Sequence, residues 1–134
     1  MNVSGRQSPV NVSHGDVYDV RLIGDTVLFA TARVRWMTLD IAIPLCTTIG
    51  DLSHQLHATG LVMDLSSLTR ATPSAGIYAI RQMKLFPIER IALLGGGSFI
   101  RAFAESVLTI ARFPALQFFE HQGDAIEWAA GNGS

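Results

Sequence analysis

Hydrophobic positions follow two different patterns along the chain, and each pattern predicts its own kind of element. After a polar start, the stretch VYDVRLIGDTVLFATARVRW holds two strand-like runs on either side of Gly24 and Asp25. A glycine that opens a two-residue turn suits a tight hairpin, because it accepts the positive φ angle that such a turn requires. We therefore expect a hairpin with arms near residues 17–23 and 26–36.

The next segment has helical spacing. Apolar residues recur every three or four positions, which is typical of a helix with one apolar face; they are Leu39, Ile43, Cys46, Ile49, Leu52 and Leu56. Pro44 interrupts the pattern, so the helix either begins near Thr38 and kinks at the proline or begins at Pro44, where a first-turn residue needs no amide donor. We favour the longer, kinked helix, ending near residues 58–60 because Gly60 accepts a left-handed conformation.

The second half alternates short apolar runs with helical ones. LVMDL, ERIALL and ALQFF lack polar alternation, as strands buried on both faces do, and helices are expected over TPSAGIYAIRQMK, SFIRAFAESVLTIARF and GDAIEWAAG. Strands that alternate with helices imply parallel crossovers. The sequence thus predicts an α/β fold in the order β-β-α-β-α-β-α-β-α, with a mixed sheet of about five strands and about four helices. This single domain would span residues 16–134 and follow a flexible tail over residues 1–15.

Composition narrows the class of protein. With 134 residues, 49% hydrophobic and 16% charged, the chain can bury one sizeable core. A net charge of -1 with scattered Lys and Arg argues against nucleic acid as a partner, and no apolar run is long enough to span a membrane. A single cysteine, Cys46, and a start without the features of a secretory signal favour the cytoplasm.

The stretch VMDLSSLTRATPSAGIYAI carries a resemblance to a known family. With the element order from Val17 to the C-terminus, it resembles the STAS domain, the module of bacterial anti-sigma factor antagonists such as SpoIIAA. It is most similar to stand-alone bacterial STAS/Sec14-like proteins. The resemblance implies a non-catalytic regulatory module that binds a protein partner and uses no cofactor.

The loop matches the family pattern only in part. Asp64 corresponds to the acidic residue that ends the family's strand, and Gly76 lies near its loop glycine. Thr72 stands where the family has an aspartate, and Pro73 stands where it has the phosphorylated serine. Proline has no hydroxyl, so the usual phosphate acceptor is absent, although Thr72 or Ser74 could serve in a shifted alignment. Helix initiation alone also explains these residues, with Thr72 as N-cap and Pro73 in the first helical position.

The surface expected to meet a partner covers residues 70–76 and the first turns of the two adjacent helices. Arg70 lies in the loop, and Gly96, Gly97 and Ser98 form the second turn. A strand, a glycine-rich turn and a helix can also bind a dinucleotide. Ile100 occupies the position of the third glycine, where close packing requires a small residue, so nucleotide binding is the least favoured alternative.

The sequence gives only weak evidence for a metal site or a reactive cysteine. Asp51, His54 and His57 could share one helix face, but without cysteine partners such a run is more typical of a solvated edge than of a metal site. Cys46 lies on the apolar face of its helix and is expected to be a small buried hydrophobe. We therefore expect no catalytic, cofactor or metal site.

The helix predicted over residues 98–113 is apolar on more than one face. One face would cover the sheet, and the other could be core or could meet a second protomer, a partner protein or an apolar ligand. We expect the protein to be a homodimer. The Sec14-like side of the resemblance implies the alternative function, a carrier or sensor of a small apolar or lipid-like ligand in a pocket under this helix.

Overall fold

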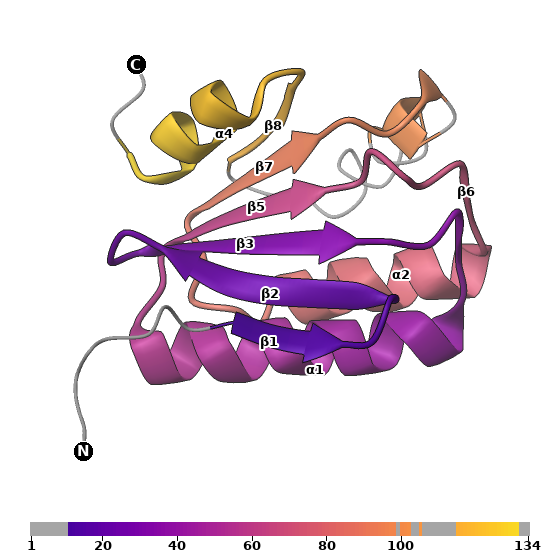
Figure 1. Ribbon diagram of the computed structural model, residues 1–134, viewed down its shortest axis with the longest axis horizontal. Helices are drawn as coiled ribbons and strands as arrows, with labels where there is room; N and C mark the ends of the chain where they lie inside the picture. Colours follow the sequence, from indigo (N-terminus) through magenta and orange to yellow (C-terminus); the bar gives the residue numbers. More distant parts are fainter. Residues whose placement is uncertain (1–10, 99, 103–104, 106–114, 132–134) are drawn as a thin grey trace.

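A six-stranded mixed sheet forms the centre of the computed structural model, which describes residues 11–98, 100–102, 105 and 115–131. The strand order is β1-β2-β3-β5-β7-β8 (Figure 1). The first three strands are antiparallel: β1 (Asn11–His14), β2 (Tyr18–Ile23) and β3 (Val27–Ala32). The others continue parallel to β3: β5 (Gly60–Asp64), β7 (Arg90–Leu94) and β8 (Leu116–Phe119).

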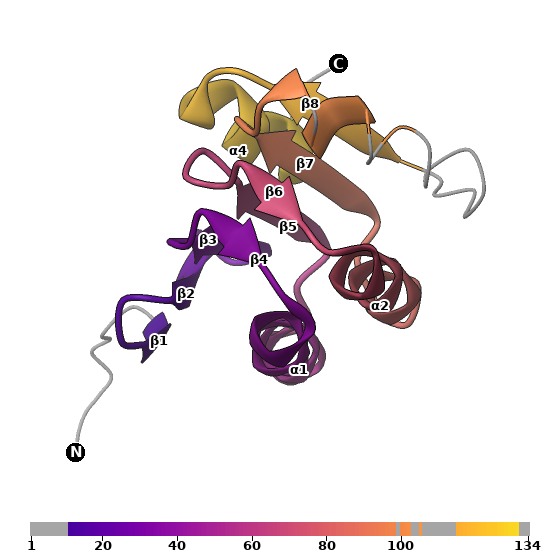
Figure 2. The same cartoon turned by 90° about the vertical axis from the view of Figure 1, so that its right-hand side faces the viewer.

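Helices cover both faces of this sheet. Two helices lie side by side on one face, and a third lies on the other (Figures 1 and 2). The pair is α1 (Leu39–Leu56) and α2 (Pro73–Met83), and the third is α4 (Gln122–Ala129). A separate two-stranded parallel ribbon, β4 (Trp36–Met37) and β6 (Arg70–Ala71), precedes α1 and α2. The predicted α/β class and mixed sheet are confirmed, with six strands in the main sheet instead of about five.

The predicted hairpin is β2 and β3. Ile23 pairs with Val27, so the turn has three residues between the paired ends and not two, and Gly24 takes a φ of 61° in it. The second arm is shorter than predicted and ends at Ala32. Trp36, assigned to that arm, belongs to β4 and pairs with β6 instead.

The tail predicted over residues 1–15 is wrong for Asn11–His14, which form β1. Val12 pairs with Val20 of β2 in this edge strand. An edge strand is paired on one side only, so backbone hydrogen bonds can hold it without the apolar run that marks a central strand. Residues 1–10 lie outside the described part of the chain.

The longer version of the first helix is correct. α1 begins after its N-cap residue Thr38 and continues through Pro44. α1 ends at Leu56, two residues before the predicted range of residues 58–60. The left-handed residue is His57 and not Gly60: it has a φ of 55°, and its amide donates to the Ser53 carbonyl. Gly60 lies in β5, where a Cβ atom would lie 2.2 Å from the carbonyl oxygen of Ala129. This glycine allows the end of α4 to approach the sheet.

Side chains of the parallel strands alternate between two cores. In β3, Leu28 packs towards α1 and α2, and Phe29 packs with α4. Leu61 and Val62 of β5 repeat this alternation. Burial on both faces explains why these strands are continuous apolar runs.

The helix predicted over residues 98–113 lies mostly outside the described residues. Ser98, residues 100–102 and Glu105 have helical backbone, and Ile100 is buried in the core beneath α1 and α2. The homodimer interface expected on that helix therefore stays a prediction. Among the helices that the structure describes, none is long and apolar enough to cross a lipid bilayer.

Candidate functional site

The β4–β6 ribbon fixes the loop that the sequence singled out. Trp36 pairs with Arg70, and the carbonyl oxygen of Arg35 accepts hydrogen bonds from the amides of Thr69 and Arg70 at 2.8 and 3.1 Å. The Thr72 amide donates to the Met37 carbonyl at 2.9 Å. These backbone bonds attach residues 69–72 to the segment that leads into α1.

Trp36 is an exposed aromatic residue of this ribbon. Its side chain is 54% exposed, and the guanidinium carbon of Arg70 lies 5.8 Å from the centre of its ring. This distance is within the range of a cation–π contact. Sequence reasoning missed Trp36 because its aromatic residue type fits the hairpin arm to which it was assigned.

Thr72 caps α2 as predicted. Its Oγ1 accepts a hydrogen bond from the Ala75 amide at 3.2 Å, and Pro73 is the first helical residue. Ser74 is exposed, and its hydroxyl lies 3.3 Å from that of Thr72. Gly76 is buried, so it lies beneath the expected partner surface and not on it.

Asp64 organises the turn after β5. Its Oδ1 accepts from the amide of Ser66 at 3.0 Å and from the hydroxyl of Ser66 at 2.5 Å. The Leu65 amide donates to the Leu94 carbonyl at 2.8 Å, which joins this turn to the end of β7. The acidic residue at the strand end thus has a structural role in holding the loop.

The glycine-rich turn packs against the same loop. Gly95 has a φ of 74°, and a Cβ atom there would lie 2.9 Å from the Cα of Ser66. Gly96 has a φ of 77°, and its Cβ would lie 3.1 Å from Cγ2 of Ile100. Close packing therefore requires these two glycines, whereas Gly97 and Ser98 are exposed.

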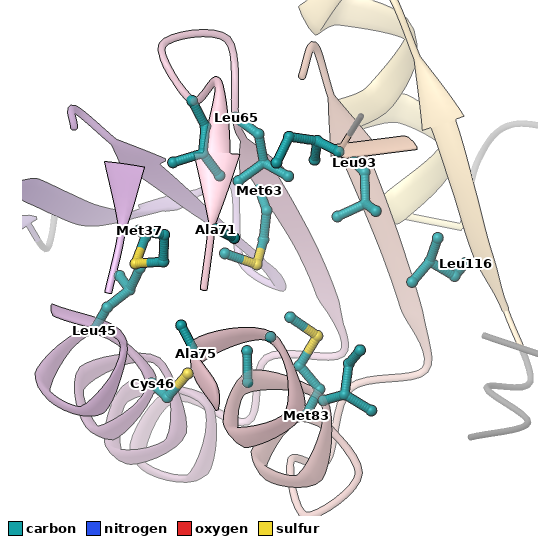
Figure 3. Close-up of a pocket in the computed structure, with 15 residues that line it drawn as sticks. Met37, Leu45, Cys46, Met63, Leu65, Ala71, Ala75, Met83, Leu93 and Leu116 are labelled. Atoms are coloured by element: carbon teal, nitrogen blue, oxygen red, sulfur yellow. The ribbon is translucent and has the colours of Figure 1, made fainter. Parts of the chain in front are cut away.

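An apolar cavity of about 110 Å³ lies behind residues 65–76, between the sheet and the two helices α1 and α2 (Figure 3). Met37 and Leu45 lie on one side of it, and Leu93 and Leu116 lie on the opposite side. Within the described part of the chain, the lining residues are all apolar: Met37, Leu45, Cys46, Met63, Leu65, Leu68, Ala71, Ala75, Gly76, Ala79, Ile80, Met83, Leu93, Ile100 and Leu116. The sequence pattern did not reveal this convergence, because the wall combines segments that are distant along the chain.

Cys46 is part of the cavity wall and has no sign of activation. The side chain is 4% exposed, and burial raises the pKa of its thiol to about 11. The thiol is therefore protonated at neutral pH, as expected for a small buried hydrophobe. Asp51, His54 and His57 are exposed, and among the described residues no three His, Cys, Asp or Glu side chains form a metal-binding group.

Comparisons with known proteins identify the fold. No family profile matches the chain, and no curated protein sequence matches it significantly. An uncharacterised DUF3478-family protein with a SpoIIAA-like fold from Shewanella loihica PV-4 has a TM-score of 0.61 at 17% identity, covering 93% of this chain and 99% of that one. The unphosphorylated anti-sigma factor antagonist SpoIIAA has a TM-score of 0.60 at 12% identity, covering 86% and 99%. The chain therefore has the SpoIIAA-like, or STAS-like, fold.

Proposed function

We propose that this protein is a non-catalytic regulatory module that binds a partner protein through an exposed surface around α2. This loop surface consists of Trp36, Arg70, Thr72, Pro73 and Ser74. The observation that carries the proposal is the exposed Trp36 ring with the Arg70 guanidinium beside it. Trp and Arg are enriched among the residues that contribute most binding energy at protein interfaces.

The surroundings of the loop surface support the same role. Leu39 in the first turn of α1 and Ile77 at the start of α2 are both exposed. Backbone bonds to Arg35 and Met37 attach the loop to the segment that carries Trp36, so Trp36 and Arg70 are presented side by side. The likeness to an anti-sigma factor antagonist also favours an interaction role.

The proposed module works without the family's usual phosphate acceptor, since Pro73 occupies that position. Of the neighbouring hydroxyls, that of Thr72 caps α2, whereas Ser74 is exposed. A phosphate added to this loop in the native host would therefore be expected on Ser74, near the positive end of the helix dipole. Phosphopeptide mass spectrometry of the native protein, with Ser74→Ala as control, tests this site.

Site-directed photocrosslinking tests partner binding. A photoreactive phenylalanine analogue replaces Trp36 in the native host, and a second variant carries it at Asp25, an exposed residue in the turn between β2 and β3. That turn lies at the opposite end of the sheet from β6 (Figure 1). We expect one protein to be crosslinked at position 36 and not at position 25.

The crosslinked protein is then purified, and its affinity is measured. Arg70→Glu should weaken binding at least 10-fold, because it reverses the charge beside Trp36. Identical crosslinks at both positions, or unchanged affinity of the Arg70→Glu variant, would contradict the proposal.

A sensor of a small apolar ligand is the second candidate function, and the cavity favours it, since the lining residues that the structure describes are all apolar. The oligomeric state and compartment are separate proposals. We propose a cytoplasmic homodimer formed through the helix predicted over residues 98–113. Light scattering that gives the mass of one 14.5 kDa chain would exclude that dimer.

A further inference from the structure

One short segment of chain contributes to both the wall of the cavity and the loop surface. Within residues 65–76, five residues line the cavity: Leu65, Leu68, Ala71, Ala75 and Gly76. Arg70, Pro73 and Ser74 of the same segment are exposed. Along β6, Arg70 faces outward and the next residue, Ala71, contributes to the cavity. The two surfaces are thus separated by a single layer of polypeptide.

The chemistry of the wall selects an uncharged apolar occupant. A buried water needs two to four polar partners, and none of the described lining side chains has a polar group other than a thiol. Dry apolar cavities of roughly 150 Å³ in other proteins bind benzene or xenon. The cavity is partly open to solvent, and its volume of about 110 Å³ suits one small ring or a short alkyl chain.

Both flexible and small residues shape this space. Met37, Met63 and Met83 come from β4, β5 and α2, and methionine adapts its shape to an occupant more readily than branched side chains do. On the side formed by β6 and α2, the wall consists largely of small residues, Ala71, Ala75, Gly76 and Ala79. A ligand would restore the dispersion contacts that these short side chains leave unmade.

We propose that the cavity binds a small uncharged apolar molecule and that its occupation changes the loop surface. The second half rests on the proposed function of that surface. A ligand in contact with Met37, Ala71 and Ala75 contacts β4, β6 and the first turn of α2 together. It favours the arrangement in which these elements close around it, since a ligand shifts an equilibrium by its differential affinity for the two states. β4 and β6 have two residues each. Few backbone hydrogen bonds therefore join them, and their pairing opens at a lower free-energy cost than the central strands do.

Benzene is the probe for the cavity itself. In protein labelled with ¹³C at the methionine methyl groups, benzene should shift the signals of Met37, Met63 and Met83 saturably. Ala79→Leu should weaken this binding at least 10-fold by filling the space, and Arg81→Leu, at an exposed position of α2, should leave it unchanged. Absence of methyl shifts in the wild-type protein would overturn the site, and this measurement depends on no variant.

Transmission to the loop surface is measured in the same titration. Trp128→Phe leaves Trp36 as the only tryptophan, and its indole signal should shift with the same dissociation constant as the methyl signals. Methyl shifts without an indole shift would overturn the transmission and leave the site standing. An Arg70→Glu variant that still binds its partner would instead overturn the proposed function, while the benzene result would be unaffected.

Discussion

Replacing Thr72 with alanine removes the oxygen that caps α2. That oxygen accepts the Ala75 amide at 3.2 Å, and its loss leaves a half-buried donor of the first turn without its acceptor. Loss of a Ser, Thr, Asp or Asn cap costs 0.5–2 kcal/mol in other proteins, typically ~1 kcal/mol. Pro73 still fixes the first helical φ, so the helix should persist with a weaker start.

The expected loss in the free energy of unfolding is therefore ~1 kcal/mol, which lowers the ratio of folded to unfolded protein about fivefold. Urea denaturation followed by circular dichroism measures it, with an unchanged dependence on urea concentration showing that the folding transition is the same. For a domain of this size the melting temperature should fall by roughly 4 °C.

Three variants of this turn test whether the loss of stability comes from the missing cap oxygen. Thr72→Ser keeps the oxygen and should keep most of the stability. Ser74→Ala changes an exposed hydroxyl and should cost less than about 0.5 kcal/mol. Thr72→Asp also supplies an acceptor, and its negative charge suits the helix N-terminus. Wild-type stability for Thr72→Ala, or an equal loss for Ser74→Ala, would refute the assignment of Thr72 as the cap.

Three further outcomes follow from other contacts. Gly60→Ala should lose about 2 kcal/mol in urea denaturation, because its Cβ would lie 2.2 Å from the backbone oxygen of Ala129; a variant as stable as wild type would show that α4 can move away without cost. Burial raises the pKa of Cys46 from 9.0 to about 11, so the unfolded thiol ionises first and stability should fall between pH 9 and 11. Cys46→Ala should lack this part of the pH dependence, and parallel stability curves would contradict the burial argument. Asp64→Ala should lose ~1 kcal/mol in urea denaturation with its two bonds to Ser66, whereas Asp64→Asn keeps an acceptor and should lose less.

Elements whose pattern is local could be predicted from the sequence. The apolar runs of β5 and β7 identify strands buried on both faces, and the spacing of α1 extends the helix through Pro44. The ribbon could not be predicted, since Trp36 and Arg70 lie 34 residues apart and each two-residue strand exists only because the other is present. The end of α1 before His57 could not be predicted from the sequence, and neither could the role of Gly60, which allows Ala129 to approach β5.

In the candidate site, too, local features could be predicted from the sequence and features that join distant segments could not. The Thr72 cap is predictable because its hydrogen bond spans three residues and the following proline marks the first turn. The cavity depends on distant segments: Met37, Ala75 and Leu116 share its wall although they come from β4, α2 and β8. Nothing in the spacing of these residues indicates that they meet.

In the proposed mechanism, a ligand in the cavity behind this loop regulates it, in place of a phosphate on its exposed side. Pro73 removes the hydroxyl at the family's usual acceptor position, whereas Ala71 and Ala75 place the same segment against a cavity. A ligand that binds only the arrangement closed around it stabilises that arrangement by about 1.4 kcal/mol at ten times its dissociation constant. This is close to the ~1 kcal/mol expected for the Thr72 cap, so a ligand with that selectivity would affect the start of α2 about as much as the cap does.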